Sequence, residues 1–303
     1  MSMRATAVGL LALGIATAAL PLMAGDYFVG VALWLLMYVA LTQSWTVLSG
    51  MTGYVSLGHV VFYGLGGYVA ALAWGALPLI AIVPLAGLAA FLLAVLIGLP
   101  VLRVRGPYFV ILTFGVAELV KHVVVAIEGW LGKFSRVLFG APDMITLFYI
   151  MLALAAAATA LTASVRASRF GHGLLAIREN EEAAETVGVP SVRFKLLAFG
   201  LSALVPGMVG SVMVLRSTYF EPQQLFDPVI SFTIVTMAVV GGSDDVKGPL
   251  LGAAGFVLLS ELLWANAPQV YMILLGLLLI VFVLFMPEGL SGKLFPPRRR
   301  GAA

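Results

Sequence analysis

Long apolar runs separated by short polar stretches repeat along the whole chain. A helix that crosses a membrane needs about 20 predominantly apolar residues. Ten runs approach this length, at residues 5–24, 28–48, 54–74, 78–102, 107–127, 145–165, 195–215, 229–241, 249–264 and 268–286. The pattern predicts an all-α polytopic membrane protein, a single domain over residues 1–303, with about ten transmembrane helices. The runs at 229–241 and 249–264 are short and interrupted by glycine, so we expect some spans to be broken or re-entrant.

A polar interruption at residues 166–195 divides the apolar pattern near its middle. It contains five basic residues and four acidic residues, and long apolar runs lie on both sides of it. Basic loops of membrane proteins face the cytoplasm, and a plain connector needs only a few residues. We therefore predict a cytoplasmic loop that offers a docking surface to a soluble partner.

Residues within this loop have the start and stop signals of a short helix. Asn180 is a good N-cap, Glu181 and Glu182 suit the first turn beside the helix dipole, and Gly188 suits the C-terminal stop. These signals predict a helix over residues 181–187. Ala183, Ala184 and Val187 would give it one weakly apolar face.

Charges in the remaining gaps fix an orientation for the predicted spans. With Arg4 inside, Arg103, Arg105 and the basic tail at residues 287–303 also lie inside, while the outer gaps are mixed or acidic. Both termini are then cytoplasmic.

The first apolar run, at residues 5–24, also has features of a secretory signal peptide. Leu22-Met23-Ala24 would be its cleavage site. The apolar core of a signal peptide has about 7–15 residues, whereas this run is long enough to span a bilayer. Its length favours a retained first helix.

Composition narrows the possible functions. Only 10% of the residues are charged and 62% are hydrophobic, against about 25% charged in soluble domains. The chain has no cysteine, which excludes disulfides and thiolate metal sites. The net charge of +3 comes from the predicted cytoplasmic loops rather than from a nucleic-acid-binding surface. No polar segment is long enough to fold as a nucleotide-binding domain, so any ATP hydrolysis belongs to another chain.

Two clusters of glycine stand out, at residues 50–67 and 241–255. Glycine in membrane helices permits close helix packing, and it also marks broken helices beside a substrate path. Both interpretations stay open for each cluster.

Few ionisable groups lie within the predicted spans. The three histidines, His59, His122 and His172, lack metal-ligand spacing, so no metal site is expected. Glu118 and Lys121 have the spacing of a self-neutralising pair near the end of a span, with His122 beside it. Glu261 has no obvious local partner.

Several motifs occur together in the order of a known family. Glu182-Ala183-Ala184-x-x-x-Gly188 resembles the EAA motif of ABC importer permeases. More widely, the chain resembles the LivM-type permeases of branched-chain amino-acid ABC importers, through the segments 53–59 (GYVSLGH), 105–109 (RGPYF), 176–180 (AIREN), 195–199 (KLLAF), 241–242 (GG), 248–253 (GPLLGA) and 287–290 (PEGL). Residues 243–247 (SDDVK) depart from the pattern, because small or apolar residues are usual there.

The resemblance implies a multi-pass transport subunit of the bacterial inner membrane and no enzyme activity in this chain. Its partners would be a LivH-type permease, two cytoplasmic ATPases that bind the ATP, and a periplasmic substrate-binding protein. The ATPases would dock on the coupling helix at Asn180–Gly188. Candidates for the substrate path are Ser56, His59, Tyr63, Tyr108 and Thr113.

Other functions stay open at this stage. Urea and amide importers share much of the pattern. A stand-alone secondary transporter would need a coupling acid in the membrane, for which only Glu118 and Glu261 qualify. An intramembrane enzyme would need a nucleophile paired with a base. Ser56 and His59 share a helix face, but no oxyanion hole or orienting acid accompanies them.

Overall fold

The computed structural model describes residues 17–23, 25–132, 135–243 and 245–266, together with the single residues 14, 273, 276 and 277. Most of the predicted spans at 5–24 and 268–286 lies outside the described residues, as do the segment 287–290 and the basic tail. The elements are α2 (Leu20–Met23), α3 (Asp26–Trp45), the π-helix η1 (Thr46–Gly50), α4 (His59–Ala73), α5 (Leu79–Val101), α6 (Pro107–Trp130), β1 (Arg136–Val137), α7 (Met144–Ala167), α8 (Arg169–Glu179), α9 (Glu181–Thr186), α10 (Ser191–Ser217), β2 (Tyr219–Phe220), α11 (Pro222–Leu225), α12 (Pro228–Gly241) and α13 (Lys247–Asn266).

Within the described residues, seven helical segments are long and apolar enough to cross a membrane. They are α3 with η1, α5, α6, α7, α10, α11 with α12, and α13. The helical class predicted from the apolar runs is confirmed. The count of about ten is not reached in this part of the chain.

The predicted span at 54–74 differs from the expectation. Its helix, α4, begins only at His59 and has 15 residues, which gives it a length of about 22 Å, short of the roughly 30 Å of a bilayer core. Gly53 has a φ of +76°, a conformation that a helix does not contain. The chain therefore leaves the helical path there, and residues 53–58 form an irregular stretch that we call the unwound segment.

The helix α10 forms the centre of the bundle and packs against α3, α4, α5 and α7. Glycine brings its backbone against that of α4. A Cβ added to Gly66 would lie 1.9 Å from the carbonyl oxygen of Gly207, and one added to Gly210 would lie 2.0 Å from that of Tyr63. The two helices thus cross at backbone contact, as small residues allow in membrane bundles.

The second glycine cluster also serves close packing. A Cβ on Gly241 would meet the carbonyl oxygen of Gly248 at 2.0 Å, and one on Gly252 would meet that of Met237 at 1.9 Å. These contacts hold α12 against α13. The glycines therefore divide between the two interpretations: Gly53 lies at a break in a helix, while Gly66, Gly241 and Gly252 lie at helix crossings.

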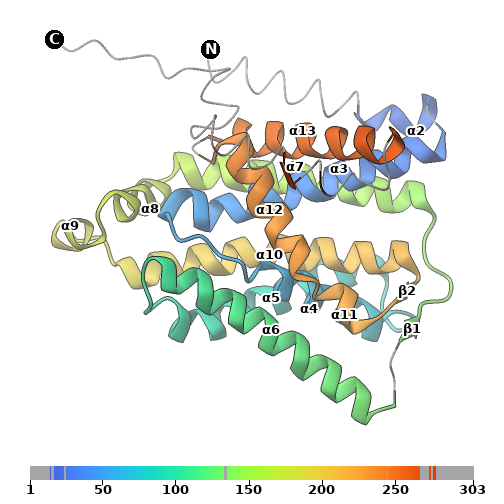
Figure 1. The fold of residues 1–303 in the computed structure, drawn as a ribbon, viewed down its shortest axis with the longest axis horizontal. Coiled ribbons are helices and arrows are strands. Elements are labelled where there is room, and N and C mark those ends of the chain that lie inside the picture. The colour runs from blue at the N-terminus through green and yellow to red at the C-terminus, as the bar shows by residue number, and fades with distance from the viewer. Residues whose placement is uncertain are drawn as a thin grey trace.

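The two ends of the bundle carry different structures (Figure 1). The helices α8 and α9 lie at one end, which we call the α9 end, and α9 extends beyond the long helices. The antiparallel pair of β1 and β2, with Arg136 opposite Phe220, lies at the other end, the β end.

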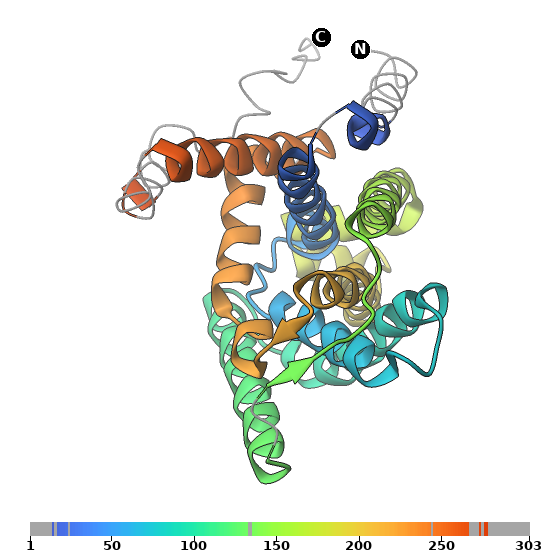
Figure 2. The ribbon, with the colours of Figure 1, turned by 90° about the vertical axis from the view of Figure 1, so that its right-hand side faces the viewer.

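Burial is uneven among the spans. The hydropathic windows of α10 and of α3 with η1 are 78% buried, whereas that of α6 is 11% buried. Figure 2 shows α6 and α13 on opposite sides of the bundle. Exposed apolar side chains of α6 include Ile111 and Leu119. Exposed apolar side chains of this kind suit contact with lipid or with another apolar helix.

Replacing Gly66 with alanine should disrupt the crossing of α4 and α10. The new methyl group would strike the backbone oxygen of Gly207, which cannot rotate away. We expect a loss of about 1–3 kcal/mol or more in the free energy of unfolding, the range of overpacked cores. The measurement is thermal unfolding of the solubilised protein, followed by tryptophan fluorescence.

Gly115→Ala is the matched control, since Gly115 lies inside α6 and nothing lies within 4 Å of its added Cβ. It should leave the melting temperature unchanged or slightly raised. Equal melting temperatures for the Gly66→Ala and Gly115→Ala proteins would contradict the crossing as described.

Candidate functional site

Local side-chain caps build the helices at the α9 end. Ser168 accepts a hydrogen bond from the backbone N–H of Gly171 and starts α8. The Asn180 side chain accepts one from the N–H of Ala183 at 3.0 Å and starts α9. Gly188, with a φ of +90°, follows its end. The predicted helix is confirmed, with its last residue at Thr186 rather than Val187.

The apolar face predicted for α9 is divided between interior and solvent. Only Ala184 is buried, whereas Ala183 is exposed and Val187 is 79% exposed. Glu182 is also exposed, at 84% of its side chain. The helix therefore rests on the bundle through one small residue and presents a mixed apolar and acidic surface outward.

A buried ionic cluster fixes α9 to the bundle. The Lys195 ammonium of α10 lies 2.6 Å from a carboxylate oxygen of Glu181, and the Tyr54 hydroxyl donates to the other carboxylate oxygen at 2.5 Å. Lys195 also donates to the Tyr54 hydroxyl oxygen at 3.1 Å. The Lys195 side chain is 2% exposed and that of Glu181 is 10% exposed. We call Tyr54, Glu181 and Lys195 the Glu181 cluster.

The environment of the cluster keeps Glu181 ionised. Burial alone would raise the pKa of this carboxyl, but hydrogen bonds from Lys195 and Tyr54, with the charges of Lys195 and Arg105, outweigh it and hold the pKa below its ordinary value. The Tyr54 hydroxyl donates to Glu181 and accepts from Lys195, so it bridges the two charges.

Arg105 lies at the rim of the cluster. Its guanidinium is 3.6 Å from carboxylate oxygens of both Glu181 and Glu182, and its side chain is 54% exposed. Exposed ion pairs at such distances contribute little. Tyr54, Arg105 and Glu181 also line a cleft of about 700 Å³ between the unwound segment, the start of α6 and α9.

A second contact joins the helices of this end to the unwound segment. The Arg178 guanidinium of α8 donates to the carbonyl oxygen of Gly50, the last residue of η1, at 2.9 Å. Tyr54 belongs to the unwound segment itself. The break in the helix is thus held on both sides by residues of α8 and α9.

Side chains of other helices satisfy backbone groups of the unwound segment and of the first turn of α4. The N–H of Leu57 donates to the Thr113 hydroxyl at 3.2 Å, and the N–H of Val60 donates to the Ser231 hydroxyl at 3.1 Å. The carbonyl of Ser56 accepts from the Trp45 indole at 2.9 Å. Irregular backbone is tolerated at membrane depth only with such partners. Ser231 was not predicted, because its partner is 171 positions away in the sequence.

Four of the five predicted path residues lie in the interior and the fifth lies at the surface. Ser56, His59, Tyr63 and Thr113 are buried, whereas Tyr108 is 73% exposed at the start of α6. Neither ring nitrogen of His59 has a hydrogen-bond partner. The role of these residues in a path stays a prediction.

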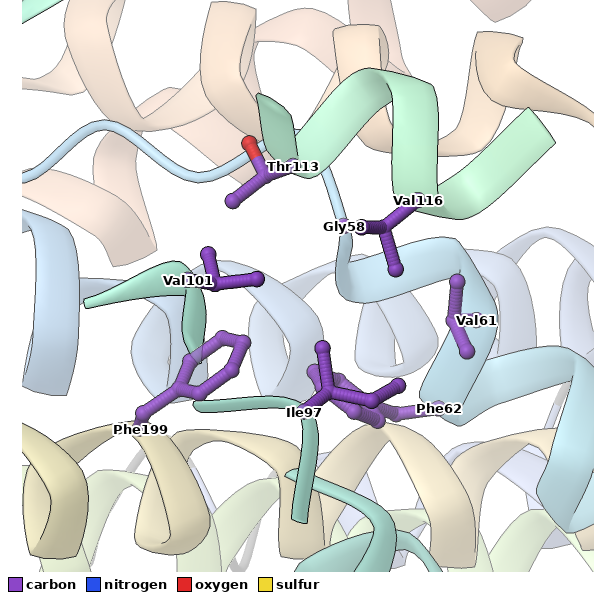
Figure 3. Close-up of a pocket in the computed structure, with 8 residues that line it drawn as sticks. All are labelled: Gly58, Val61, Phe62, Ile97, Val101, Thr113, Val116 and Phe199. Carbon is purple, nitrogen blue, oxygen red and sulfur yellow. The ribbon is translucent and has the colours of Figure 1, made fainter. Parts of the chain in front are cut away.

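The interior beside these residues is closed. A cavity of about 10 Å³ lies there. Figure 3 shows the residues that line it, which are Gly58, Val61, Phe62, Ile97, Val101, Thr113, Val116 and Phe199. This volume is at the lower limit for one water molecule. A solute of amino-acid size passes here only if the surrounding helices separate.

The two acidic residues singled out within the predicted spans, Glu118 and Glu261, have partners. The Lys121 ammonium lies 2.6 Å from the Glu118 carboxylate, as the spacing predicted. Glu261 accepts a hydrogen bond from the Tyr27 hydroxyl of α3, a contact between distant parts of the sequence. At the β end, the buried Glu128 and the partly exposed Arg136 form an ion pair at 2.6 Å that was not predicted. No group of three metal-ligating side chains occurs among the described residues.

Comparison with known proteins identifies the family. A family described as "Branched-chain amino acid transport system / permease component" matches residues 27–283. The chain belongs to this permease family. Together with the apolar helices, this makes the chain a membrane protein.

Individual relatives match the permease over most of its length. It is 28% identical to the "High-affinity branched-chain amino acid transport system permease protein LivM" of Salmonella typhimurium strain LT2, over 93% of this chain and 74% of the relative. The LivM protein of Escherichia coli strain K12 is also 28% identical, with the same coverage. The resemblance to LivM-type permeases is confirmed.

A shorter match links the permease to sugar transport proteins. The "L-arabinose transport system permease protein AraH" of Escherichia coli strain K12 is 32% identical over 126 residues, 38% of this chain and 37% of the relative. No solved structure gives a significant match. The relatives are thus transport permeases, and they include proteins named for different solutes.

Removing both charges of the cluster, by Glu181→Gln with Lys195→Met, should change how stability depends on pH. A carboxyl whose folded pKa is depressed contributes stability above its ordinary pKa of 4.5, and this contribution is lost as the pH falls through the folded value. The melting temperature of the native permease should therefore fall relative to the variant below about pH 4.5. A difference that stays constant from pH 7 to pH 3.5 would contradict this account.

Proposed function

We propose that this permease is one membrane subunit of an ABC importer that carries branched-chain, apolar amino acids across the bacterial inner membrane. Its partners are a second, LivH-type permease, two cytoplasmic ATPases that bind ATP, and a periplasmic substrate-binding protein. The observation that carries the proposal is the similarity to LivM proteins over 93% of the chain. A local motif shared by many transporters would not extend so far.

The coupling site in this proposal is the segment from Asn180 to Gly188. The exposed side chains of Glu182 and Val187 give it an acidic and apolar surface to which a soluble ATPase can bind. A short helix capped at its start transmits displacement better than a flexible loop does. The ATPases approach each other when they bind ATP, and α9 carries this movement into the bundle.

The orientation follows from charge. Arg166, Arg169 and Arg178 lie at the α9 end, and a cytoplasmic position for that end agrees with the positive-inside rule. The β end then faces the periplasm, where the substrate-binding protein delivers its solute. Both termini are cytoplasmic in this arrangement.

Transport requires the closed interior beside α4, which we call the seam, to open. Ser56, His59, Tyr63 and Thr113 would then line a modestly polar path, with Tyr108 near its inner mouth. The unpaired nitrogens of the buried His59 support this role, because a solute or water that entered the seam would supply their missing partners.

One alternative concerns the solute and is supported by a specific observation, whereas the other concerns the mechanism and is opposed by one. The match to the arabinose permease supports a different solute, such as a sugar, and urea or amides remain candidates from the resemblance. A stand-alone secondary transporter would need a free coupling acid, but Glu118 is paired with Lys121 and Glu261 with Tyr27. These pairings favour the ATP-driven system.

Uptake of labelled solutes tests the function directly. Cells that lack the gene should lose most high-affinity leucine uptake and regain it when the gene is restored, while uptake of urea and arabinose stays unchanged. The effect should require ATP and persist when the proton gradient is dissipated. Loss of urea or arabinose uptake alone would replace the solute in the proposal, and leucine transport by this chain alone in liposomes would overturn the ABC mechanism.

Disturbing the coupling site should abolish transport without removing the protein from the membrane. Glu182→Lys reverses an exposed charge of α9, and Gly188→Pro places proline where φ is +90°, which its ring forbids. We expect leucine uptake by the double variant to fall to background at normal membrane content.

Gly75→Pro is the matched control for local strain, since Gly75 is a surface glycine with a φ of +87° in the turn between α4 and α5. It should retain uptake. Wild-type uptake by the Glu182→Lys, Gly188→Pro variant would defeat the assignment of the coupling site.

A further inference from the structure

We propose that Tyr54 and Lys195 are positioning residues that make α9 and the unwound segment move as one unit. Displacement of α9 by the ATPases would then act directly on the break between η1 and α4. This inference rests on the proposed function, and it names the contact through which movement of α9 enters the membrane part of the protein.

The contacts place the two moving parts side by side. Glu181, the first residue of α9, accepts a hydrogen bond from Tyr54 at 2.5 Å. Arg178, three residues earlier, donates to Gly50 at 2.9 Å. These two links reach the chain on either side of Gly53, whose φ of +76° marks the break. A pull on α8 and α9 is therefore applied across the break itself.

Burial makes the Glu181 link strong. Lys195 is 2% exposed and its nearest carboxylate is Glu181, so separating the pair would leave a charge without a partner in the interior. Tyr54 bridges both charges through one hydroxyl. The contacts of Arg105 to the same helix are longer and more exposed, so they are weaker and should break before the Glu181–Lys195 pair does.

The unwound segment is able to move, and its movement reaches other helices. Within Gly53–Gly58 the backbone lacks a continuous ladder of helical hydrogen bonds, and the cleft of about 700 Å³ borders it at Gly53, Tyr54 and Val55. Its inner side is attached to α6 through Thr113, and the first turn of α4 is attached to α12 through Ser231. Helix ends that absorb a change of φ and ψ are typical hinges.

The middle of α10 is a poor candidate for the moving part. Its backbone touches that of α4 at Gly66 and Gly210, and the helix also packs against α3, α5 and α7. Lys195 lies near the start of α10, away from this crossing, and it keeps Glu181 beside Tyr54, whose hydroxyl passes the displacement to the unwound segment. This division of roles predicts different outcomes for substitutions at the two residues.

The test is Tyr54→Phe in the complete complex, reconstituted in liposomes with both permeases, both ATPases and the binding protein. The ring and its edge contact with Phe109 remain, and only the hydroxyl is lost. We expect ATPase activity and assembly close to wild type, with leucine transported per ATP hydrolysed reduced about tenfold, the change expected for one charge-assisted hydrogen bond.

Tyr149→Phe is the matched control, since its hydroxyl donates to the carbonyl of Ala18 at 3.1 Å, away from the cluster. It should keep the wild-type ratio of transport to hydrolysis. A wild-type ratio for Tyr54→Phe would overturn the inference. Loss of assembly by Tyr54→Phe would also overturn it, because the hydroxyl would then serve folding alone.

Exchanging the charges, as Glu181→Lys with Lys195→Glu, gives a second test. Each single change should abolish coupled transport, and the double change should restore a substantial part of it, because the ion pair is remade between α9 and α10. Absence of any recovery in a correctly assembled double variant would contradict the role of the pair. If the wild-type complex itself fails to couple ATP hydrolysis to leucine uptake, the proposed function fails instead.

Discussion

The ion pair of Glu181 and Lys195 is the interaction on which the organisation of the α9 end depends. A helix of six residues has no stability of its own in water, because nucleation is costly and too few hydrogen bonds follow. Asn180 caps α9 and Ala184 is buried beneath it, and the buried charges link its first residue to α10. The projecting helix α9 is thereby attached firmly to the bundle at its first residue.

The second constraint is the demand of the membrane interior for satisfied backbone groups. The chain leaves the helical path at Gly53, just before its third apolar run, and must then supply partners for the backbone amides that follow. The hydroxyl oxygens of Thr113 and Ser231, which lie on two different helices, accept hydrogen bonds from two of these amides. A break that would be unstable alone becomes a defined part of the bundle.

Local features of the sequence predicted the helices well, and long-range contacts were out of its reach. The apolar runs at 78–102, 107–127 and 145–165 became α5, α6 and α7, because hydropathy over about 20 residues depends on neither fold nor partner. The cap at Asn180 is equally local. Tyr54 and Glu181 are 127 positions apart, so their spacing in the sequence could not predict the contact. Lys195 was counted among the charges that face the cytoplasm, whereas its ion pair buries it.

The crossing of α4 and α10 restricts how this protein can vary. The atom that faces Gly66 is the carbonyl oxygen of Gly207, which every amino acid carries. A larger residue at Gly66 therefore has no second-site suppressor on α10, since no side chain there can be shortened to make room. The spacing of these two helices is set by main-chain atoms, and genetic drift in the surrounding side chains leaves it unchanged.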